Sequence, residues 1–276
     1  MTPNCLACNY LIEAEELLLE GSVSFDYFKF PSFGLEPGEK GLADFFALLE
    51  KIIKVKPVLY HGIYPNTTNL CAPHFKEDFD ITVLKQVCEL AGSPGISIHL
   101  DGADKQMSRK NVVATAIDAI SYLKEHFSNM TFISLENTEH SLNPHIFDPL
   151  VISEIIHETG LAFLLDVSHA NWAAEERGDS LLDYIGQLPM DQLYEIHING
   201  WIKHQGEQIA HLKIQDELYP LIESLIAHSP AQIITLEYGR SLAVPGADLP
   251  LVSSQKSNPR AKAELKEQLL RLSELI

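Results

Sequence analysis

The sequence predicts an α/β protein with the (β/α)8 architecture of a TIM barrel. Its 276 residues are close to the roughly 250 that such barrels usually contain. Short β-rich runs alternate with amphipathic helical patterns about eight times along this length, as expected for a parallel barrel. No linker or low-complexity segment divides the chain, so residues 1–276 are expected to form one domain.

Eight runs of buried character are the predicted strands, and segments with helical spacing of apolar residues lie between them. The strands are expected at residues 4–8, 24–30, 57–61, 96–100, 131–136, 161–166, 193–198 and 233–237. The helices are expected at residues 11–20, 42–52, 80–90, 111–127, 148–158, 216–228 and 261–276. The stretches at 31–40, 62–77 and 241–258 are interpreted as surface loops.

The charge balance argues against several classes of partner. The chain has 20 Lys and Arg against 38 Asp and Glu, a formal net charge of −18 that would repel nucleic acids and anionic membranes. No run approaches the roughly 18 apolar residues of a membrane span, and the N-terminus does not resemble a signal peptide. Four cysteines do not make a disulfide framework, so a cytoplasmic location is expected, and the Cys5–Cys8 pair is interpreted as strand packing.

Six successive predicted strands end in a residue that can bind a metal. In a (β/α)8 barrel the carboxyl ends of the strands carry the active site. These ends carry His61, His99, Glu136, Asp166, His197 and Glu237, and His169 follows three residues after the sixth strand. Acids and imidazoles are hard to bury together unless a cation neutralises the acids and accepts the nitrogen lone pairs. The pattern therefore predicts a metal site.

The other histidines lie in predicted loops or on helix faces, where solvated side chains are the simpler interpretation. They are His74, His126, His140, His145, His157, His204 and His228. Lys29, at the end of the second strand, and Arg240, after the eighth, could each bind an anionic group of a substrate or could be surface residues. Asn137 could support a metal ligand or could simply begin a loop.

The order of these motifs resembles the xylose-isomerase-like metal barrels. It most closely resembles the multinuclear non-heme iron-dependent oxidative enzymes, whose members include the methanobactin-biosynthesis oxidase. The strongest match is the block at residues 160–200, which contains the strand-Asp-x-x-His and "EIHING" motifs. Shorter matches are "HGI" (61–63), "SIHL" (97–100), "LEN" (135–137) and "LEY" (236–238).

The resemblance implies a multinuclear metal centre. A first metal would be held by His61, His99 and Glu136, and Glu136 would bridge to a second metal held by Asp166, His197 and Glu237. A third position would use His169 and His211. In the family this third position also draws on an Asp two residues before its second His, and this chain has Ile209 there. A two-metal centre is therefore the safer expectation.

The resemblance also implies a reaction. It points to two or three iron ions that activate oxygen to modify a cysteine-containing peptide, with Glu136, Asp166, His197 and Glu237 as the catalytic set. Manganese or zinc also suits these ligands. Relatives usually work beside a peptide-recruiting protein, so a partner chain is expected.

Three other functions stay open. A sugar isomerase or epimerase would use Glu136, Asp166, His197 and Glu237 with a proton-shuttling carboxylate or lysine, but leaves His61 and His99 without a task. A metal-dependent phosphodiesterase or endonuclease would need all three metal positions and would bind an anionic substrate. The net charge of −18 counts against the anionic substrate, and Ile209 counts against the third metal position. A non-enzymatic metal-binding protein is the third.

Overall fold

Eight parallel strands form where the sequence predicts them, in a computed structural model of the chain. The described residues are 4–30, 41–62, 70–72, 74–78, 80–139, 141–239 and 256–276. The barrel strands are β1 (Cys5–Asn9), β2 (Tyr27–Phe30), β3 (Val58–His61), β4 (Gly95–His99), β5 (Phe132–Glu136), β6 (Ala162–Asp166), β7 (Leu193–Ile198) and β10 (Ile233–Leu236). They follow the order β1-β10-β7-β6-β5-β4-β3-β2 of a closed barrel, which confirms the predicted (β/α)8 fold.

The helices are α1 (Ile12–Leu19), α2 (Gly41–Ile52), α3 (Phe75–Asp78), α4 (Ile81–Ala91), α5 (Arg109–His126), α6 (Pro149–Thr159), α7 (Val167–Arg177), α8 (Leu181–Ile185), α9 (Tyr219–His228) and α10 (Pro259–Ser273). All seven predicted helices are present. The sequence analysis missed α7 and α8, as well as the short α3 inside the predicted loop at 62–77. The loop predicted at 31–40 lies outside the described residues. So does most of the loop predicted at 241–258.

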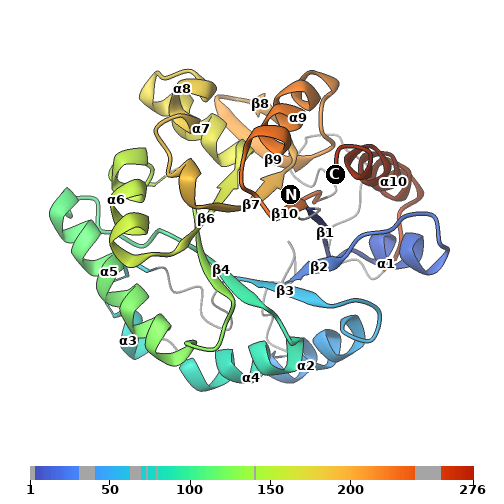
Figure 1. Ribbon diagram of the computed structural model, residues 1–276, viewed down its shortest axis with the longest axis horizontal. Coiled ribbons are helices and arrows are strands. Elements are labelled where there is room, and N and C mark those ends of the chain that lie inside the picture. The colour runs from blue at the N-terminus through green and yellow to red at the C-terminus, as the bar shows by residue number, and fades with distance from the viewer. Residues whose placement is uncertain are drawn as a thin grey trace. The chain divides into compact units, whose positions relative to one another are not determined.

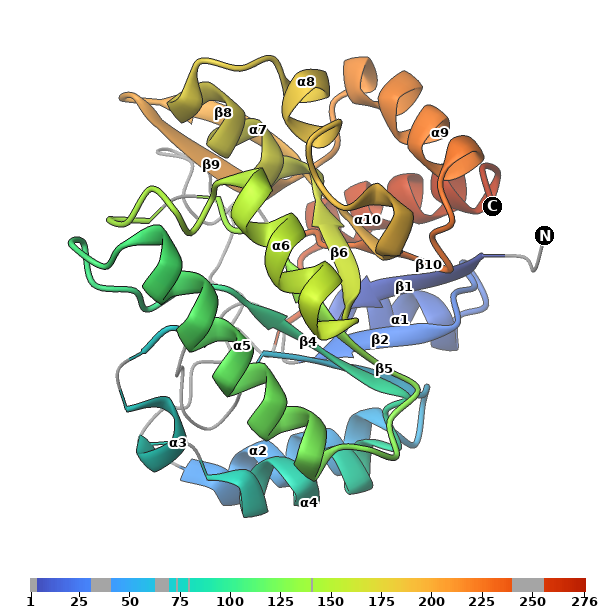
Figure 2. The same cartoon turned by 60° about the vertical axis from the view of Figure 1, so that its left-hand side comes forward.

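The chain contains two compact units, Met1–Leu59 with Glu195–Ile276, and Tyr60–Tyr194. In the second unit α4, α5 and α6 lie on the outer side of β4, β5 and β6 (Figure 1), and Figure 2 shows α5 beside α6. In the first unit α1 lies beside α10 (Figure 1). The expectation of a single domain stays a prediction.

The barrel strands are buried along nearly their whole length, as expected for parallel strands covered by helices. Their apolar residues form the core, and the buried polar residues are concentrated near the strand ends. Within the second unit Tyr60 pairs with Ile96 and His99 pairs with Glu136, so ligand-type side chains of neighbouring strands come close together. The register of the strands therefore positions the site.

A two-stranded antiparallel sheet was not predicted. It consists of β8 (Gly200–His204) and β9 (Glu207–Leu212), which Figure 2 shows as a ribbon. Its tight turn places Gln205 at φ 53° and Gly206 at φ 91°, both in the left-handed region. Asn-Gly or Asp-Gly is the usual sequence of such a turn, and Gln-Gly gives a weaker signal.

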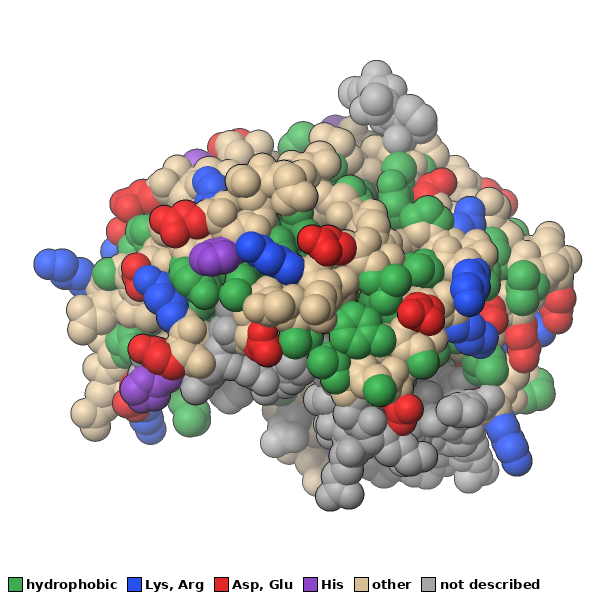
Figure 3. All heavy atoms as spheres, turned by 90° about the horizontal axis from the view of Figure 1, so that it is seen from below, with side chains coloured by type: hydrophobic (Ala, Val, Ile, Leu, Met, Phe, Trp, Pro, Cys, Tyr) green, Lys and Arg blue, Asp and Glu red, His purple; other side chains and the backbone are tan. Residues whose placement is uncertain are grey.

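The helix ends have local causes. The side chain of Asp80 accepts hydrogen bonds from two main-chain N–H groups at the start of α4, and Asn258 does the same for α10. Gly92 and Gly160 end α4 and α6 in the left-handed conformation, which glycine adopts without a Cβ clash. No helix among the described residues is long and apolar enough to cross a membrane. On the face seen in Figure 3, basic and acidic side chains are interspersed with hydrophobic ones.

One packing contact gives a test of the barrel. A Cβ atom at Gly95 would lie 2.6 Å from ring carbons of Phe132, the residue paired with Gly95 across β4 and β5. The Phe132 ring packs against Tyr194 in a tilted arrangement with centroids 4.5 Å apart, which limits its movement. We expect Gly95→Ala to lower the free energy of unfolding by about 1–3 kcal/mol, measured by urea denaturation. Adding Phe132→Leu should cancel part of this loss, and strictly additive effects of the two substitutions would contradict the argument.

Candidate metal centre

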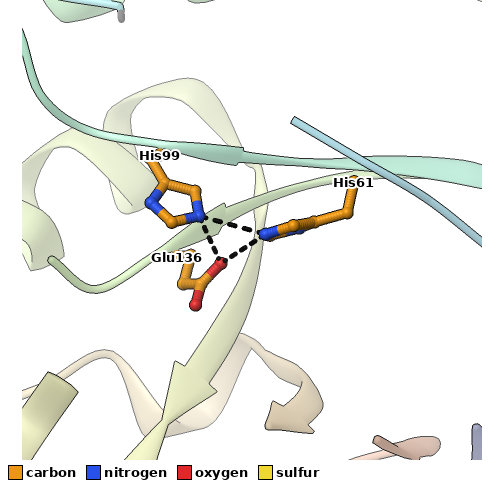
Figure 4. A group of neighbouring side chains, drawn as sticks. All are labelled: His61, His99 and Glu136. Atoms are coloured by element: carbon orange, nitrogen blue, oxygen red, sulfur yellow. Dashed lines mark hydrogen bonds and ion pairs between the residues drawn. The ribbon is translucent and has the colours of Figure 1, made fainter. Parts of the chain in front are cut away.

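Three predicted ligands converge at the ends of β3, β4 and β5. His99 Nε2 lies 2.9 Å from Glu136 Oε2, and His61 Nε2 lies 3.4 Å from the same oxygen. The two imidazole Nε2 atoms are 3.1 Å apart. Figure 4 shows the three side chains pointing toward one another. Glu136 is only 1% exposed, whereas His61 and His99 are half-buried, so the cluster has a buried side and an accessible side.

The distances in this cluster fit a bound cation. At a metal–ligand distance of about 2.1 Å, two ligand atoms lie about 3.0 Å apart at a bond angle of 90° and about 3.4 Å apart in a tetrahedron. The three observed separations of 2.9, 3.1 and 3.4 Å lie close to this range. When both imidazoles are neutral with the proton on Nδ1, all three atoms carry lone pairs, and a cation between them removes their mutual repulsion. The cluster therefore fits a metal ion.

Asp166 ends β6 and also begins α7. Its Oδ1 accepts hydrogen bonds from the His169 main-chain N–H at 2.8 Å and from the Ser168 hydroxyl at 2.7 Å. This is the N-cap of α7, so the helix starts at the residue directly after the strand. The cap places His169 within the first turn of α7, and both Asp166 and His169 are buried. One carboxylate oxygen of Asp166 thus serves the start of the helix.

Asn137 joins the ends of β5 and β6. Its side-chain amide accepts from the Asp166 main-chain N–H at 2.8 Å and donates to the Asp166 carbonyl at 3.0 Å. The Asn137 main-chain carbonyl lies 3.0 Å from Nδ1 of His169. Asn137 thus contacts two predicted ligands, as the supporting interpretation of this residue expects, and that interpretation stays a prediction.

Glu139 was not anticipated by the sequence analysis. Its Oε2 lies 3.4 Å from Nε2 of His169. A main-chain carbonyl only accepts, so His169 Nδ1 must carry a proton for the bond to Asn137, and a neutral ring then presents its Nε2 lone pair to Glu139. Glu139 follows the "LEN" motif by two residues, and its short distance to His169 depends on a loop that a motif does not describe.

A second group of charged residues lies in the unit that contains β7 and β10. Lys29 Nζ lies 2.7 and 2.8 Å from the two oxygens of Glu195, and the Thr235 hydroxyl donates to Glu195 at 2.6 Å. His197 lies between two carboxylates, with Nε2 3.1 Å from Glu195 and Nδ1 3.2 Å from Glu237. Burial would raise the pKa of Glu195, but attraction to Lys29 and His197 and their hydrogen bonds hold that pKa well below its usual range.

The surroundings of Lys29 differ from those that both interpretations of this residue expected. It is fully buried in an ion pair, so it is neither a surface lysine nor a group reaching out to a substrate. Glu195 was missed, although the sequence carries a signal for it. Alternate residues of a strand share a face, so the "EIH" motif puts Glu195 on the same side of β7 as His197.

His211 lies on β9 with φ 60°, a left-handed conformation that is uncommon outside glycine. Its main-chain N–H donates to the Asn199 side chain at 3.0 Å, and its Nδ1 lies 3.8 Å from Glu237 Oε2. Ile209, where the family pattern has Asp, also belongs to β9. The His211 backbone is thus fixed beside Glu237 although the Asp is missing.

The other candidates do not join these groups. Arg240 and His140 lie outside the described residues. Cys8 is buried in β1 and its partner Cys5 is partly buried, in agreement with strand packing rather than a zinc pair. Burial raises the pKa of the Cys71 and Cys88 thiols to about 12, so these buried thiols are not nucleophiles near neutral pH.

Comparison with known proteins supports the fold. No protein-family model matches the sequence, and no curated protein sequence matches it. Among solved structures, a xylose isomerase domain containing protein from Salmonella typhimurium LT2 is similar with a TM-score of 0.66 and 15% identity, over 99% of this chain and 97% of the other. The IolI protein with a bound zinc atom has a TM-score of 0.65 and 12% identity, over 99% of both chains.

A D-psicose 3-epimerase from Clostridium cellulolyticum H10, solved with D-tagatose, has a TM-score of 0.64 and 13% identity over 98% of both chains. At these identities the likeness shows the fold. The resemblance to xylose-isomerase-like barrels is therefore confirmed at the level of the fold. The narrower resemblance to multinuclear iron oxidative enzymes is not supported by these structures.

The cluster of Figure 4 predicts metal-dependent stability. Because a ligand that binds only the folded state stabilises it, free metal at 100 times its Kd should add about 2.7 kcal/mol to the free energy of unfolding. Glu136→Gln removes the shared negative charge and should weaken metal binding by more than about 100-fold, above the usual effect of outer-shell partners. Calorimetric titration of metal-free protein with Fe²⁺, Mn²⁺ and Zn²⁺ measures the affinity, and urea denaturation with and without metal measures the stability.

The matched control is His126→Ala, because His126 Nδ1 contacts a main-chain carbonyl on α5 and belongs to neither cluster. Its affinity for metal should equal that of the unmodified chain. A protein that binds none of the three metals would exclude the site.

The contact between His169 and Glu139 predicts how a third position behaves. Because Ile209 stands where the iron-dependent enzymes that the sequence resembles have Asp, metal titration should show two tight equivalents and at most one weaker one. Glu139→Gln should weaken that equivalent further, and Ile209→Asp should tighten it. Three equally tight equivalents in the unmodified chain would show that the absence of this Asp does not weaken metal binding at the third position.

Proposed function

We propose that this chain is a metal-dependent enzyme that uses iron and oxygen to modify a cysteine-containing peptide. The observation that carries the proposal is the convergence of His61, His99 and Glu136. Two histidines and one carboxylate on one face of an ion, with the other positions open, are typical of non-heme Fe(II) enzymes that use oxygen. The side chains of His61 and His99 are 16% and 36% exposed, so a substrate can approach one side of the cluster.

We further propose that the centre holds a second ion, with Glu136 as the bridging carboxylate. The resemblance assigns Asp166, His197 and Glu237 to this ion. All three are buried at strand ends, and each lies in a network that orients it. A buried carboxylate is costly unless a cation or hydrogen bonds compensate it, which supports these residues as ligands.

In this proposal the chain's own residues bind and orient the metal, and the peptide thiolate is brought to the open side. Iron, when bound, would supply electrons for the reduction of oxygen and a Lewis-acidic position for the thiolate. Asn137 and the α7 N-cap hold Asp166 and His169 in place during this chemistry. A separate peptide-recruiting protein is part of the proposal, as the resemblance suggests.

The second candidate is a metal-dependent sugar isomerase or epimerase. The solved structures support it better than the first, since the similar proteins include a D-psicose 3-epimerase solved with a sugar. Such an enzyme would polarise a carbonyl with the ion at Glu136, Asp166, His197 and Glu237. It would leave the pair His61 and His99 without a role. Lys29 does not suit the part of proton shuttle, because Glu195 holds it in a buried ion pair.

The remaining alternatives have less support. A phosphodiesterase would bring an anionic backbone to a chain with a formal charge of −18. A non-enzymatic metal-binding protein would not need an open side to the cluster.

The decisive experiment measures oxygen consumption. Protein loaded anaerobically with Fe²⁺ is given air and a cysteine-containing peptide encoded beside its gene, together with the partner protein if one is encoded there. We expect oxygen uptake and a change in peptide mass, because the cysteine thiolate is the proposed reacting group. Asp166→Ala and His197→Ala should abolish both, and His126→Ala should leave both intact.

The same peptide with Ser in place of Cys is the matched substrate control, and it should not react. A parallel assay offers free ketohexoses and aldohexoses to Mn²⁺-loaded protein without oxygen. Robust sugar isomerisation there, with no oxygen uptake on any candidate peptide, would falsify the oxidative proposal in favour of the second candidate.

A further inference from the structure

The imidazole of His197 is held between two carboxylates in the interior of its unit. Its Nε2 lies 3.1 Å from Glu195 Oε1, and its Nδ1 lies 3.2 Å from Glu237 Oε1. The side chains of His197 and Glu195 are 0% exposed and that of Glu237 is 4% exposed. A neutral imidazole has one donor and one acceptor, so the two carboxylates compete for a single ring proton.

The surroundings of Glu195 decide where that proton lies. Lys29 Nζ contacts both Glu195 oxygens, at 2.7 and 2.8 Å, and Thr235 donates to Oε1 at 2.6 Å. A carboxylate bound by an ammonium group through both oxygens is ionised and can only accept. Glu195 therefore requires a donor on the His197 side, and Nε2 must carry the proton.

The consequence concerns the other ring nitrogen. With the proton on Nε2, the lone pair of a neutral His197 lies on Nδ1, which faces Glu237 Oε1 at 3.2 Å. Two acceptors at this separation repel each other unless a cation lies between them. The distance is also within the range of about 3.0–3.4 Å expected for two ligands of one ion.

We infer that Glu195 is a positioning residue, held by Lys29 and Thr235, that fixes His197 as an Nδ1 metal ligand. This inference rests on the proposed metal site and is independent of the reaction class. Histidine ligands generally donate their other ring N–H to a carboxylate or carbonyl, which sets the tautomer and the ring orientation. Here the orienting carboxylate is itself neutralised by a buried lysine.

Lys29 has a specific electrostatic task in this arrangement. Without it, Glu195 would be a buried anion next to the metal ligand and would compete with Glu237 for the positive charge of the ion. With it, the ion pair Lys29–Glu195 is neutral, and Glu237 is left as the charged partner of His197. Removing only one member of a buried pair leaves an uncompensated charge. Single substitutions at Lys29 or Glu195 should therefore lower the stability of the fold more than removing both charges does.

The test measures metal binding and the tautomer of His197 separately. Metal-free protein labelled with 15N at histidine is examined by long-range 1H–15N NMR, with His197→Gln to assign the resonance. We expect the Nε2–H tautomer in the unmodified chain. A protonated ring between about pH 6 and 8, or the Nδ1–H tautomer, overturns the inference.

Calorimetric titration with Mn²⁺ and Zn²⁺ gives the second readout. Glu195→Gln should weaken one metal equivalent by about 10–100-fold, the usual effect of removing an outer-shell partner, and should leave the equivalent at His61 and His99 unchanged. Thr235→Val removes one hydrogen bond without creating a buried charge, and it should weaken the same equivalent less. Lys29→Met combined with Glu195→Gln should fold better than Lys29→Met alone.

The matched control is Glu267→Gln, because Glu267 forms a lysine ion pair at 2.7 Å on the exposed surface of the same unit. It should not change either equivalent. If Glu195→Gln does not fold, the Thr235→Val titration and the NMR of the unmodified chain still decide. Failure of the unmodified chain to bind any metal would refute the proposed metal site. Normal binding that is insensitive to both substitutions would refute only the role of Glu195.

Discussion

The central constraint on this structure is the buried carboxylate of Glu136. Its side chain is 1% exposed, and the imidazoles of His61, His99 and His169 lie 2.9–3.4 Å from its carboxylate oxygens. Imidazoles neutralise a carboxylate only when they are protonated, whereas a cation satisfies carboxylate and imidazoles together. The pairing of β4 with β5 sets His99 directly beside Glu136, and the end of β3 adds His61. The strand register thus brings together a carboxylate and imidazoles whose charges and lone pairs a bound metal ion would compensate.

The two units compensate their buried acids in different ways. In one, the imidazoles of His61, His99 and His169 lie beside Glu136, and protons on these rings or a bound cation would compensate its charge. In the other, Lys29 neutralises Glu195 within the chain itself. The first arrangement is suited to a residue that binds metal directly, and the second to a residue that orients a ligand. The same side chain, glutamate at or near a strand end, therefore takes two roles according to its neighbours.

The barrel could be predicted because its strands are short apolar runs bounded by polar residues, and six of the eight runs end near a ligand-type residue. The convergence of His61, His99 and Glu136 followed from that rule, since parallel strands bring their carboxyl ends together. The helix α7 could not be predicted in the same way. Its sequence "VSHANWAAEER" has only a weak amphipathic pattern, and the helix depends on the Asp166 cap and on tertiary packing.

Contacts between side chains that are distant in the sequence could not be predicted either. Lys29 and Glu195 are 166 residues apart, and no local pattern links them. The contact between Glu139 and His169 depends on the path of a loop. The resemblance to a family anticipated the xylose-isomerase-like fold, which the solved structures confirm, but its narrower assignment to oxidative enzymes has only the site residues in its favour. Fold follows from patterns repeated along the whole chain, whereas reaction class depends on a few side chains.

The direct junction of β6 and α7 has a consequence for how this chain can vary. No residue separates Asp166 from the helix that it caps, and the cap sets the position of His169. One inserted residue here would rotate the start of the helix by about 100°, because an α-helix has 3.6 residues per turn. The same insertion would break the hydrogen bond between the Asp166 cap and the His169 main-chain N–H. Natural variation in length should therefore be confined to other loops, and this junction should keep its length among homologues even where the surrounding sequence has diverged.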